Sequence, residues 1–554
     1  MIPRAIRFKI SIIIVTMGFS VTGIANGDNS GMSKAEFDWL MSESAVPSSL
    51  HQQQQRAPVR RPAPTRKAPH RPVVRTRPPQ VPVKRQPVQQ GNMLRQLPWN
   101  VRTLLQKSNV NPNTMGAFIL RIGDKQPMMV FNENNPKVPA SVMKLVTTYA
   151  ALGALGANYR WPTEVYMTGN LRGGTLNGNL IIKGYGAPDF NTVGLRQIIK
   201  QLRNKGVRNI NGNVVFDTSY FQPPHIDPGA FDGKRYETYN AQPDALLFNE
   251  KTSEFIVQNV RGRPSVYSPT PAHNVRVVNN IKSVRSRCRG SARSPRMSIA
   301  SNQNQHVVTF SGRYSTRCGK RNYKKAITDS SNMIFASLKQ HWQRDAGGKF
   351  NARFARGTTP RNARLLYRHM SAPLSQIIQE VNKKSNNLMA RQVMLTIGAR
   401  KLGAPSTPRK SELAIKQWLN SQGLKFPELR IENGSGLSRW SRISARHIGE
   451  LLLHAYRSPH RHLLSNSLAV AGRDGTMKKR LRGTPVAGRG RFKTGTLKDT
   501  RAIAGYVRGV DGRDYIVAIL HNDVTARRRG KKAHDALIQW AYWHGKPPQK
   551  LAKK

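Results

Sequence analysis

A serine and a lysine stand three positions apart within residues 138–145, as Ser141 and Lys144. Apolar residues follow Lys144 at helical spacing, which predicts a helix that has one buried face and begins near Ser141. Because residues i and i+3 share a helix face, the Lys144 amine can reach the Ser141 hydroxyl. Serine is a weak nucleophile without a base, and lysine can act as that base when burial or neighbouring cations lower its pKa. Alone, the pair also fits a surface helix with an N-terminal serine.

Two later motifs indicate an active site. Ser385 and Asn387 form an S-x-N motif before a helix predicted to run through Ile397, and a Lys-Thr-Gly triplet at 493–495 precedes a predicted pair of strands. A second S-x-N at 330–332 shows that this pattern alone is weak. Chance placement of all three motifs, each beside the right kind of element, is far rarer than any single match.

The three motifs together fit acyl transfer. Ser141 is expected to attack a carbonyl carbon. Lys144 takes the serine proton, and the charge of Lys493 lowers the pKa of Lys144. Ser385 is expected to relay a proton to the leaving amine, and Asn387 to hold the substrate backbone and orient Lys144. These roles need neither a metal nor a cofactor.

Substrate binding is expected at the Lys-Thr-Gly strand. Lys493, Thr494 and Thr496 supply a cation and hydroxyl groups for a substrate carboxylate. Gly495 lets the substrate approach the strand closely. The backbone N–H groups of Ser141 and Thr496 are expected to form the oxyanion hole, which typically contributes about 3 kcal/mol in the transition state.

These motifs resemble those of the penicillin-binding and serine β-lactamase superfamily. The long insertion between Lys144 and Ser385 is similar to that of the class C low-molecular-weight penicillin-binding proteins, the D-Ala-D-Ala carboxypeptidase/endopeptidase family. The resemblance extends from about Met93 to the C-terminal helix. Further matching stretches are Ser385-Asn386-Asn387-Leu388, Gly434-Ser435-Gly436-Leu437-Ser438-Arg439, Asp474-Gly475-Thr476-Met477 and Lys493-Thr494-Gly495-Thr496-Leu497.

The resemblance implies that peptidoglycan stem peptides and penicillin acylate Ser141. It implies removal of the terminal D-Ala, cleavage of D-Ala-to-diaminopimelate cross-links, or both. The chain departs from the family at Gly186-Ala187-Pro188-Asp189, where Gly-Asp-Pro is usual. An acid in the insertion is expected to recognise the free amine of the diamino acid, and Asp232 is the candidate.

The elements around the motifs predict an α/β (α+β) fold, in which helices flank an antiparallel sheet. A helix is predicted from Met93 to Lys107, and a hairpin around Gly123-Asp124 leads to the Ser141 helix. Near the end, Asp511-Gly512 predicts a second hairpin, which a helix from Lys532 to His544 follows. We assign residues 92–160 and 326–548 to the catalytic domain.

Strand-like runs separated by Gly, Pro and Asn turns assign residues 161–325 to a β-rich insertion of about one domain's size. It contains Cys288 and Cys318, the only cysteines in the chain. In an exported protein such a pair favours a disulfide over a metal site. A similar pair occurs in some members of the family that the motifs resemble.

The first 25 residues predict an export signal, with basic residues before an apolar run that is short for a membrane span. An uncleaved anchor is the alternative. Residues 26–91 are rich in Pro, Arg and Gln, which predicts a disordered basic spacer. We therefore expect an exported, periplasmic protein that is either soluble or peripheral to a membrane.

The formal net charge is +63, from 91 lysines and arginines against 28 acids. This excess suggests a polyanionic partner, which could be nucleic acid, anionic lipid or an acidic wall polymer, unless it is only a solvated basic surface that aids solubility. We expect an anionic envelope polymer to contact the basic spacer, and the other expected partners are peptidoglycan and β-lactams. No sequence motif specific for nucleic acid is present. Two alternatives to the peptidase remain: a β-lactamase, or a polyanion- or wall-binding protein with little catalysis.

Overall fold

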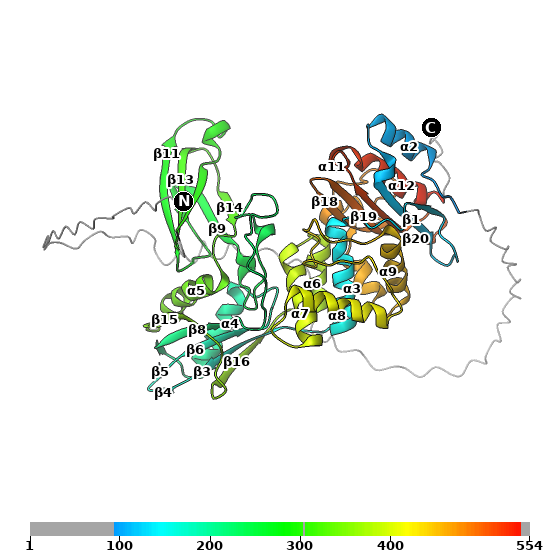
Figure 1. The fold of residues 1–554 in the computed structure, drawn as a ribbon. Helices are drawn as coiled ribbons and strands as arrows, with labels where there is room; N and C mark the ends of the chain where they lie inside the picture. Colours follow the sequence, from blue (N-terminus) through cyan, green and yellow to red (C-terminus); the bar gives the residue numbers. More distant parts are fainter. Residues whose placement is uncertain (1–92, 303–304, 545–554) are drawn as a thin grey trace, which may run out of the picture. The chain divides into compact units, whose positions relative to one another are not determined.

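The computed structural model describes residues 93–302 and 305–544. Figure 1 shows the elements of this part of the chain. The signal predicted for residues 1–25 and the spacer predicted for 26–91 lie outside the described residues, so both stay predictions. Among the described residues, no helix has the length and apolar character needed to cross a membrane.

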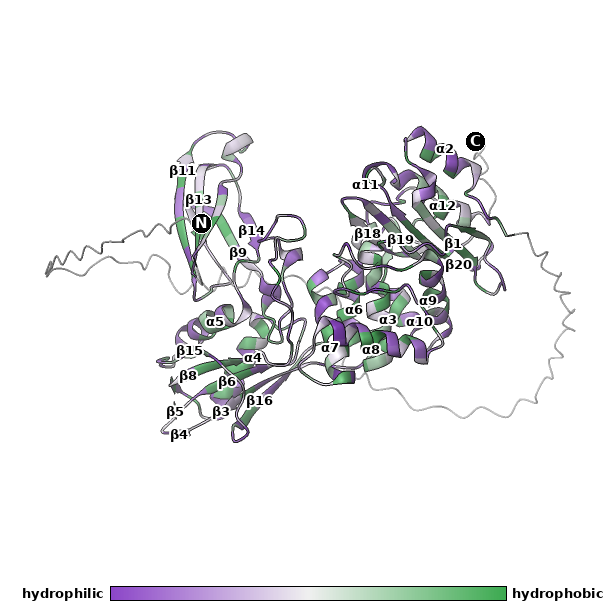
Figure 2. Ribbon diagram, viewed as in Figure 1, coloured by the Kyte–Doolittle hydropathy of each residue, from purple (hydrophilic) through white to green (hydrophobic). Residues whose placement is uncertain are grey.

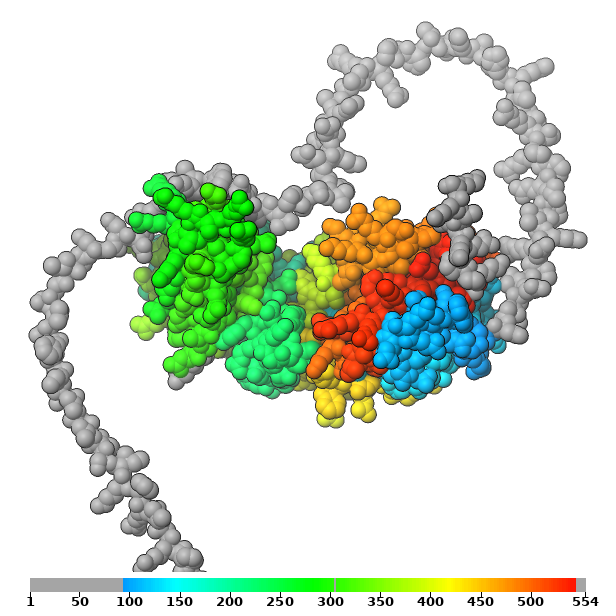
Figure 3. Space-filling model, turned by 90° about the horizontal axis from the view of Figure 1, so that it is seen from above, coloured from blue at the N-terminus to red at the C-terminus, as the bar shows by residue number. Residues whose placement is uncertain are grey.

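A six-stranded sheet joins the first and last described segments of the chain. Its order is β17-β18-β19-β20-β1-β2, and each neighbouring pair is antiparallel. Figure 3 shows the blue N-terminal and red C-terminal residues side by side, as the pairing of β1 with β20 requires. The strands are β1 (Met115–Arg121), β2 (Met129–Phe131), β17 (Ala469–Val470), β18 (Gly490–Leu497), β19 (Thr500–Arg508) and β20 (Asp514–Asn522).

Helices cover both faces of this sheet. On β19, Ala502 and Ala504 face one hydrophobic cluster, whereas Ile503 and Val507 face the other. The first face packs against α9 (Ala445–Arg457), and the second against α12 (Lys531–Tyr542), which also contacts α2 (Trp99–Lys107). In Figure 2 the strands of the sheet are largely coloured as hydrophobic. An antiparallel sheet between helices confirms the predicted fold class.

The first helix is shorter than expected. It begins at Trp99 instead of Met93, directly after Pro98. Leu94 forms a β-bridge with Met129, and its backbone N–H donates to the carbonyl of Met128. The chain before Pro98 therefore extends the sheet edge, and Pro98 marks the point where a helix can start.

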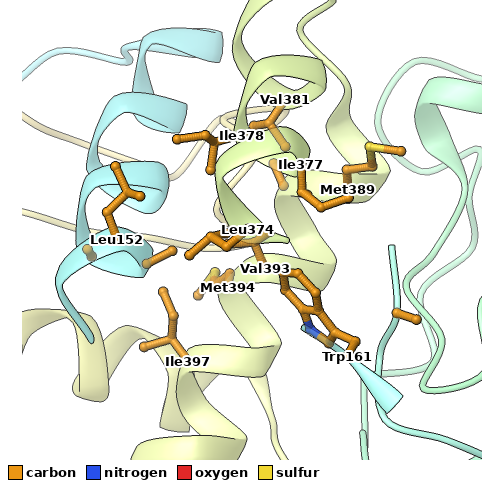
Figure 4. Close-up of a cluster of buried hydrophobic side chains, with 14 of the residues drawn as sticks. Leu152, Trp161, Leu374, Ile377, Ile378, Val381, Met389, Val393, Met394 and Ile397 are labelled. Carbon is orange, nitrogen blue, oxygen red and sulfur yellow. The ribbon is translucent and has the colours of Figure 1, made fainter. Parts of the chain in front are cut away.

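A second helical layer positions the first two motifs. Helices α3 (Met143–Leu155), α6 (Leu374–Lys383) and α7 (Asn387–Leu402) pack against one another, and α8 (Pro408–Ser421) packs against α3 and α7. Figure 4 shows their shared core, where Leu152, Ile378 and Val393 come from three different helices. Two short helices, α10 (Arg461–Ser467) and α11 (Ala526–Arg529), complete the helical elements of this region.

A separate five-stranded sheet has the order β15-β8-β6-β3-β16. Strands β15 and β16 come from residues 353–370, a segment that was expected in the catalytic domain. They pair instead with strands of the inserted region, β15 with β8 and β16 with β3. The elements are β3 (Pro162–Met167), β6 (Leu180–Gly184), β8 (Asn213–Asp217), β15 (Arg353–Arg356) and β16 (Arg364–Met370), with α4 (Thr192–Asn204) and α5 (Ser330–Arg344) beside them. A small sheet joins β4 (Asn170–Arg172), β5 (Thr175–Asn177) and β7 (Asn209–Asn211).

Two three-stranded sheets, β10-β9-β14 and β11-β13-β12, enclose a small core around Phe255 and Phe310. This segment is bright green in Figure 3. Cys288 and Cys318 form a disulfide beside it, as predicted. The strands are β9 (Ser253–Val260), β10 (Arg263–Tyr267), β11 (Val275–Val284), β12 (Arg296–Asn302), β13 (Gln305–Ser315) and β14 (Arg321–Lys325).

Candidate active site

Ser141 lies in a tight 3₁₀ turn, Ala140–Val142, and the α-helix itself begins two residues later at Met143. Two glycines allow the chain to close around this turn. A Cβ on Gly495 would lie 3.0 Å from the Ser141 nitrogen, and one on Gly436 would lie 1.8 Å from the Ala140 carbonyl oxygen. Only glycine fits at such short distances. Gly495 therefore lets β18 approach the nucleophile turn closely, and the close approach of substrate to this strand stays a prediction.

Lys144 is fully buried, and its amine has three oxygen neighbours. Nζ donates to the side-chain oxygen of Asn387 at 2.7 Å and to the backbone carbonyl of Ser435 at 2.6 Å. It lies 3.1 Å from the Ser141 Oγ. A neutral amine has two hydrogens and one lone pair. With both hydrogens donated to Asn387 and Ser435, the lone pair is left to accept the proton of Ser141.

The surroundings of Lys144 favour this neutral form. Burial lowers its pKa well below the usual value, and the charges of Lys493 and Arg391 lower it further. Removing a cation from water and placing like charges nearby both disfavour the protonated amine. Lys144 therefore meets the chemical requirement for a general base toward Ser141.

The S-x-N motif lies between α6 and α7. Ser385 has a φ of 59°, in the left-handed region, and the next residue, Asn386, caps α7 by accepting from the Met389 N–H at 3.0 Å. Asn387 begins α7. Its Oδ1 accepts from Lys144, and its Nδ2 donates to the backbone carbonyl of Tyr239 at 3.3 Å. The side chain of Asn387 thus joins the base to a loop of the inserted region.

Lys493 is fully buried on β18. Its Nζ donates to the Ser385 Oγ at 2.8 Å and to the Thr494 carbonyl at 3.0 Å. Burial lowers its pKa to about 7. Thr494 donates from its hydroxyl to the hydroxyl of Thr476 at 2.8 Å, and Thr496 is exposed at the same strand. Lys493 therefore links the Ser385 hydroxyl to the strand that was expected to bind substrate.

The structure brings together the side chains of the three motifs. Three further groups reach the site without having been assigned a role from sequence: the Ser435 carbonyl, the Thr476 hydroxyl and the charge of Arg391. The stretches that contain Ser435 and Thr476 had been noticed only as family-like segments. Arg391 lies four residues after Asn387, so helical periodicity alone places both on one face of α7.

Arg391 ties α7 to the inserted region. It is 7% exposed, and its Nη1 donates to the carbonyls of Ala241 at 2.6 Å and Asn240 at 3.4 Å. These carbonyls follow Tyr239, which accepts from Asn387. Two α7 side chains one turn apart therefore hold the same short loop.

Asp232 contacts the same loop and accepts three hydrogen bonds. Its carboxylate accepts from the Tyr239 hydroxyl at 2.7 Å, from the Asn240 amide at 2.8 Å and from the Lys234 N–H at 3.1 Å. Burial alone would raise the Asp232 pKa, but these hydrogen bonds outweigh it and lower that pKa overall. The charged form of Asp232 is thus favoured.

The sequence and the fold of this chain are similar to those of known proteins. The sequence profile of the D-Ala-D-Ala carboxypeptidase 3 (S13) family matches residues 97–543. The D-alanyl-D-alanine carboxypeptidase DacB of Haemophilus influenzae is 25% identical over 460 residues, covering 80% of this chain and 92% of that protein. The D-alanyl-D-alanine carboxypeptidase of Actinomadura sp. is 25% identical over 438 residues, covering 76% and 80%. The crystal structure of penicillin binding protein 4 from H. influenzae has the same fold, with a TM-score of 0.67 at 24% identity, covering 80% of this chain and 99% of that one.

Proposed function

The chain belongs to the D-Ala-D-Ala carboxypeptidase 3 (S13) family, and we propose that it is a serine D,D-peptidase whose Ser141 is acylated by peptidoglycan stem peptides and by penicillin. The observation that carries this assignment is the amine of Lys144. It is buried and held by Asn387 and Ser435, so that its lone pair is left for Ser141.

Acylation follows from this arrangement. The Lys144 amine takes the proton of Ser141 as Oγ bonds to the carbonyl carbon of the penultimate D-Ala. The backbone N–H groups of Ser141 and Thr496 stabilise the oxyanion of the tetrahedral intermediate. The C–N bond to the last D-Ala then breaks, and the Lys144 proton passes through the Ser385 hydroxyl to the leaving amine. The products are an ester at Ser141 and free D-Ala.

Hydrolysis reverses the proton path. Lys144 takes a proton from water, the water oxygen attacks the ester carbon, and the Ser141 oxygen leaves with the proton from Lys144.

The substrate's terminal carboxylate is bound by the Lys493 cation with the hydroxyls of Thr494 and Thr496. In endopeptidase action the leaving amine belongs to a diaminopimelate residue of the neighbouring stem, and the bond cleaved is otherwise the same.

We propose Asp232 as the group that recognises the amine of the diamino acid. Support comes from its favoured charged form and from its loop, which Asn387 and Arg391 hold at the site. Asp232→Asn removes the charge and keeps one acceptor oxygen, while the other oxygen is replaced by an amide donor. We expect it to lower kcat/KM for a diaminopimelate stem peptide while leaving acylation by penicillin unchanged. Equal loss for both acyl donors would contradict this role.

We also propose that the protein is exported and works on the wall in the periplasm. The basic n-region followed by a short apolar run supports this, together with membership of a peptidase family that includes wall enzymes. Fractionation of cells that produce the tagged chain, with sequencing of the mature N-terminus, tests both the compartment and the cleavage.

Mass spectrometry of the purified chain after benzylpenicillin tests the central assignment. We expect a penicilloyl adduct on the wild type and on Ser375→Ala, a control serine on α6, but none on Ser141→Ala. No adduct with intact penicillin would overturn the peptidase assignment and favour a binding protein. No adduct with rapid consumption of penicillin would instead identify a β-lactamase.

A further inference from the structure

The β-rich segment from Ser253 to Lys325 is far more basic than a folded domain requires. It has fifteen lysines and arginines and one acid, Glu254. Its two ion pairs join Lys324 to Glu254 and Lys325 to Glu237. Nearly all the other cations of this segment are exposed.

Strand alternation gathers four of these cations on one face. In β11, Val277 and Ile281 point into the small core, so Arg276 and Lys282 point outward. In β13, Phe310 and Tyr314 point inward. In β12, Met297 and Ile299 point inward. The same alternation therefore makes Arg313 of β13 and Arg296 of β12 point outward. The four residues, which we call the basic sheet face, are Arg276, Lys282, Arg296 and Arg313, and all are exposed.

Strand register brings three of these cations close together, whereas Arg276 pairs with Val307 nearer the other end of the same face. Lys282 pairs directly with Arg313, and Arg296 pairs with Ser311 on the adjoining strand. The two strands are parallel, and like charges side by side on neighbouring strands repel, so this pair adds no stability to the sheet. Because the fold gains nothing from placing Lys282 beside Arg313, their positions point to a partner outside the chain.

The loop after β11 extends the basic sheet face. It contains four more exposed arginines, and Cys288 in their midst is bonded to Cys318. Arg313 donates from Nη2 to the Ser291 hydroxyl at 3.2 Å, which ties the loop to the sheet. No ion pair involves these loop arginines among the described residues. They are Arg285, Arg287, Arg289 and Arg293.

Two features indicate the chemistry of the partner. Seven of these eight cations are arginines, whose planar guanidinium binds phosphate oxygens in pairs. On β12 and β13 the side chains between them on the face are small, those of Ser298, Ala300, Thr309 and Ser311. No aromatic side chain stands on the face, as one would to stack nucleic acid bases. An array of arginines on the open face of a sheet suits the array of phosphates at a lipid surface.

We propose that the basic sheet face and its arginine loop dock the protein on an anionic phospholipid surface, with the guanidinium groups binding lipid phosphates. The proposal goes beyond the peptidase assignment and does not depend on it. Each surface cation typically strengthens binding to anionic lipid by about fivefold. Four cations acting together therefore strengthen binding to an anionic membrane several hundredfold, by about 600-fold.

Vesicle sedimentation with the whole mature chain tests the proposal. The variant replaces Arg276, Lys282, Arg296 and Arg313 by Gln. The control replaces the same number of exposed cations of the same types elsewhere, in Arg172→Gln, Lys200→Gln, Arg361→Gln and Arg409→Gln. Resistance of residues 253–325 to chymotrypsin, which does not cleave at the substituted cations, reports that this segment is folded in each protein. The two variants have the same net charge, so a difference between them comes from location.

We expect the wild type and the control to bind vesicles containing phosphatidylglycerol, and not vesicles of phosphatidylcholine alone. The sheet-face variant should bind the anionic vesicles at least about 100-fold more weakly. Equal weakening in the control would show that only net charge matters and would overturn the proposal. Binding to duplex DNA or soluble polyphosphate that is as tight, and equally lost in the variant, would overturn it in favour of a soluble polyanion.

Discussion

The amine of Lys144 donates to the side-chain oxygen of Asn387 at 2.7 Å, although 243 positions separate the two residues. Each lies at or near the start of a helix, α3 for Lys144 and α7 for Asn387, and these helices share the core shown in Figure 4. The base of the site is therefore held by helix packing, which fixes catalytic groups more firmly than loops do.

Replacing Lys144 by Arg should remove the base while keeping a cation. Arginine stays protonated even when buried, so it cannot accept the Ser141 proton. We expect the rate of acylation by a fluorescent penicillin to fall by roughly 10²- to 10⁴-fold. Lys498→Arg, at an exposed position just after β18, is the control and should acylate normally. A near-normal rate in Lys144→Arg would show that another group takes the proton.

Lys493→Arg should change the alkaline side of the pH profile. Burial lowers the Lys493 pKa to about 7, so the free enzyme loses this cation as the pH rises through that value. We expect kcat/KM for a D-Ala-D-Ala peptide to decline above about pH 7, because the substrate carboxylate loses its partner. Arginine keeps its charge, so the decline should vanish in the variant, whatever its maximal rate. If kcat/KM of Lys493→Arg still declines above about pH 7, another group is responsible for the decline.

Gly495→Ala should push the nucleophile out of place. The new Cβ would lie 2.7 Å from the Pro139 carbonyl oxygen and 3.0 Å from the Ser141 nitrogen, both backbone atoms. A displacement of about 1 Å can lower a rate by about 100-fold, and we expect a loss of that order in penicillin acylation. Gly319→Ala, where nothing lies within 4 Å of the added carbon, is the control. Thermal unfolding of both variants separates a displaced site from a misfolded chain.

Removing the disulfide should loosen one part of the molecule only. Cys288 and Cys318 are 30 positions apart, and closing a loop of that length contributes about 3–4 kcal/mol to stability. We expect the double Ser variant to be cleaved by trypsin within residues 253–325 much faster than the wild type, with penicillin acylation unchanged. Reductant should reproduce this in the wild type and add nothing in the variant. Equal cleavage of the oxidised wild type and the variant would count against the expectation.

The site was predictable where its chemistry depends on side-chain type. Ser141 and Lys144 are neighbours on one helical turn, so their contact follows from spacing alone. Asn387 and Lys493 come from distant segments and were assigned because their short motifs occur together with Ser141 and Lys144, since spacing cannot reveal such contacts. The Ser435 contact uses a backbone carbonyl, which every residue has, so no residue type identifies it. Arg391 was missed because a charged residue is ordinarily expected on an exposed face.

The fold was predictable where patterns are strong. The hairpin of β19 and β20 was expected from Asp511-Gly512 between two apolar runs, and the structure has it. The strands β15 and β16 were not expected. They read Arg-Phe-Ala-Arg and Arg-Leu-Leu-Tyr-Arg-His-Met, with too many cations for a clear apolar alternation. Their pairing with β8 and β3 is set by the sheet they join, which is a tertiary effect.

Replacing Arg391 by Met should shift the acidic side of the pH profile. The Arg391 charge helps to lower the Lys144 pKa, so removing it should raise that pKa. Since unprotonated Lys144 is the base, the pH below which acylation falls should move upward. Arg391→Lys keeps the charge and should leave it nearly in place. Arg391 also donates to the Ala241 carbonyl, so the Met variant can lose rate for structural reasons. A purely structural role would lower the rate without moving the acidic side of the pH profile. If the acidic side of the pH profile stays in place in Arg391→Met, the role of Arg391 is limited to holding the loop.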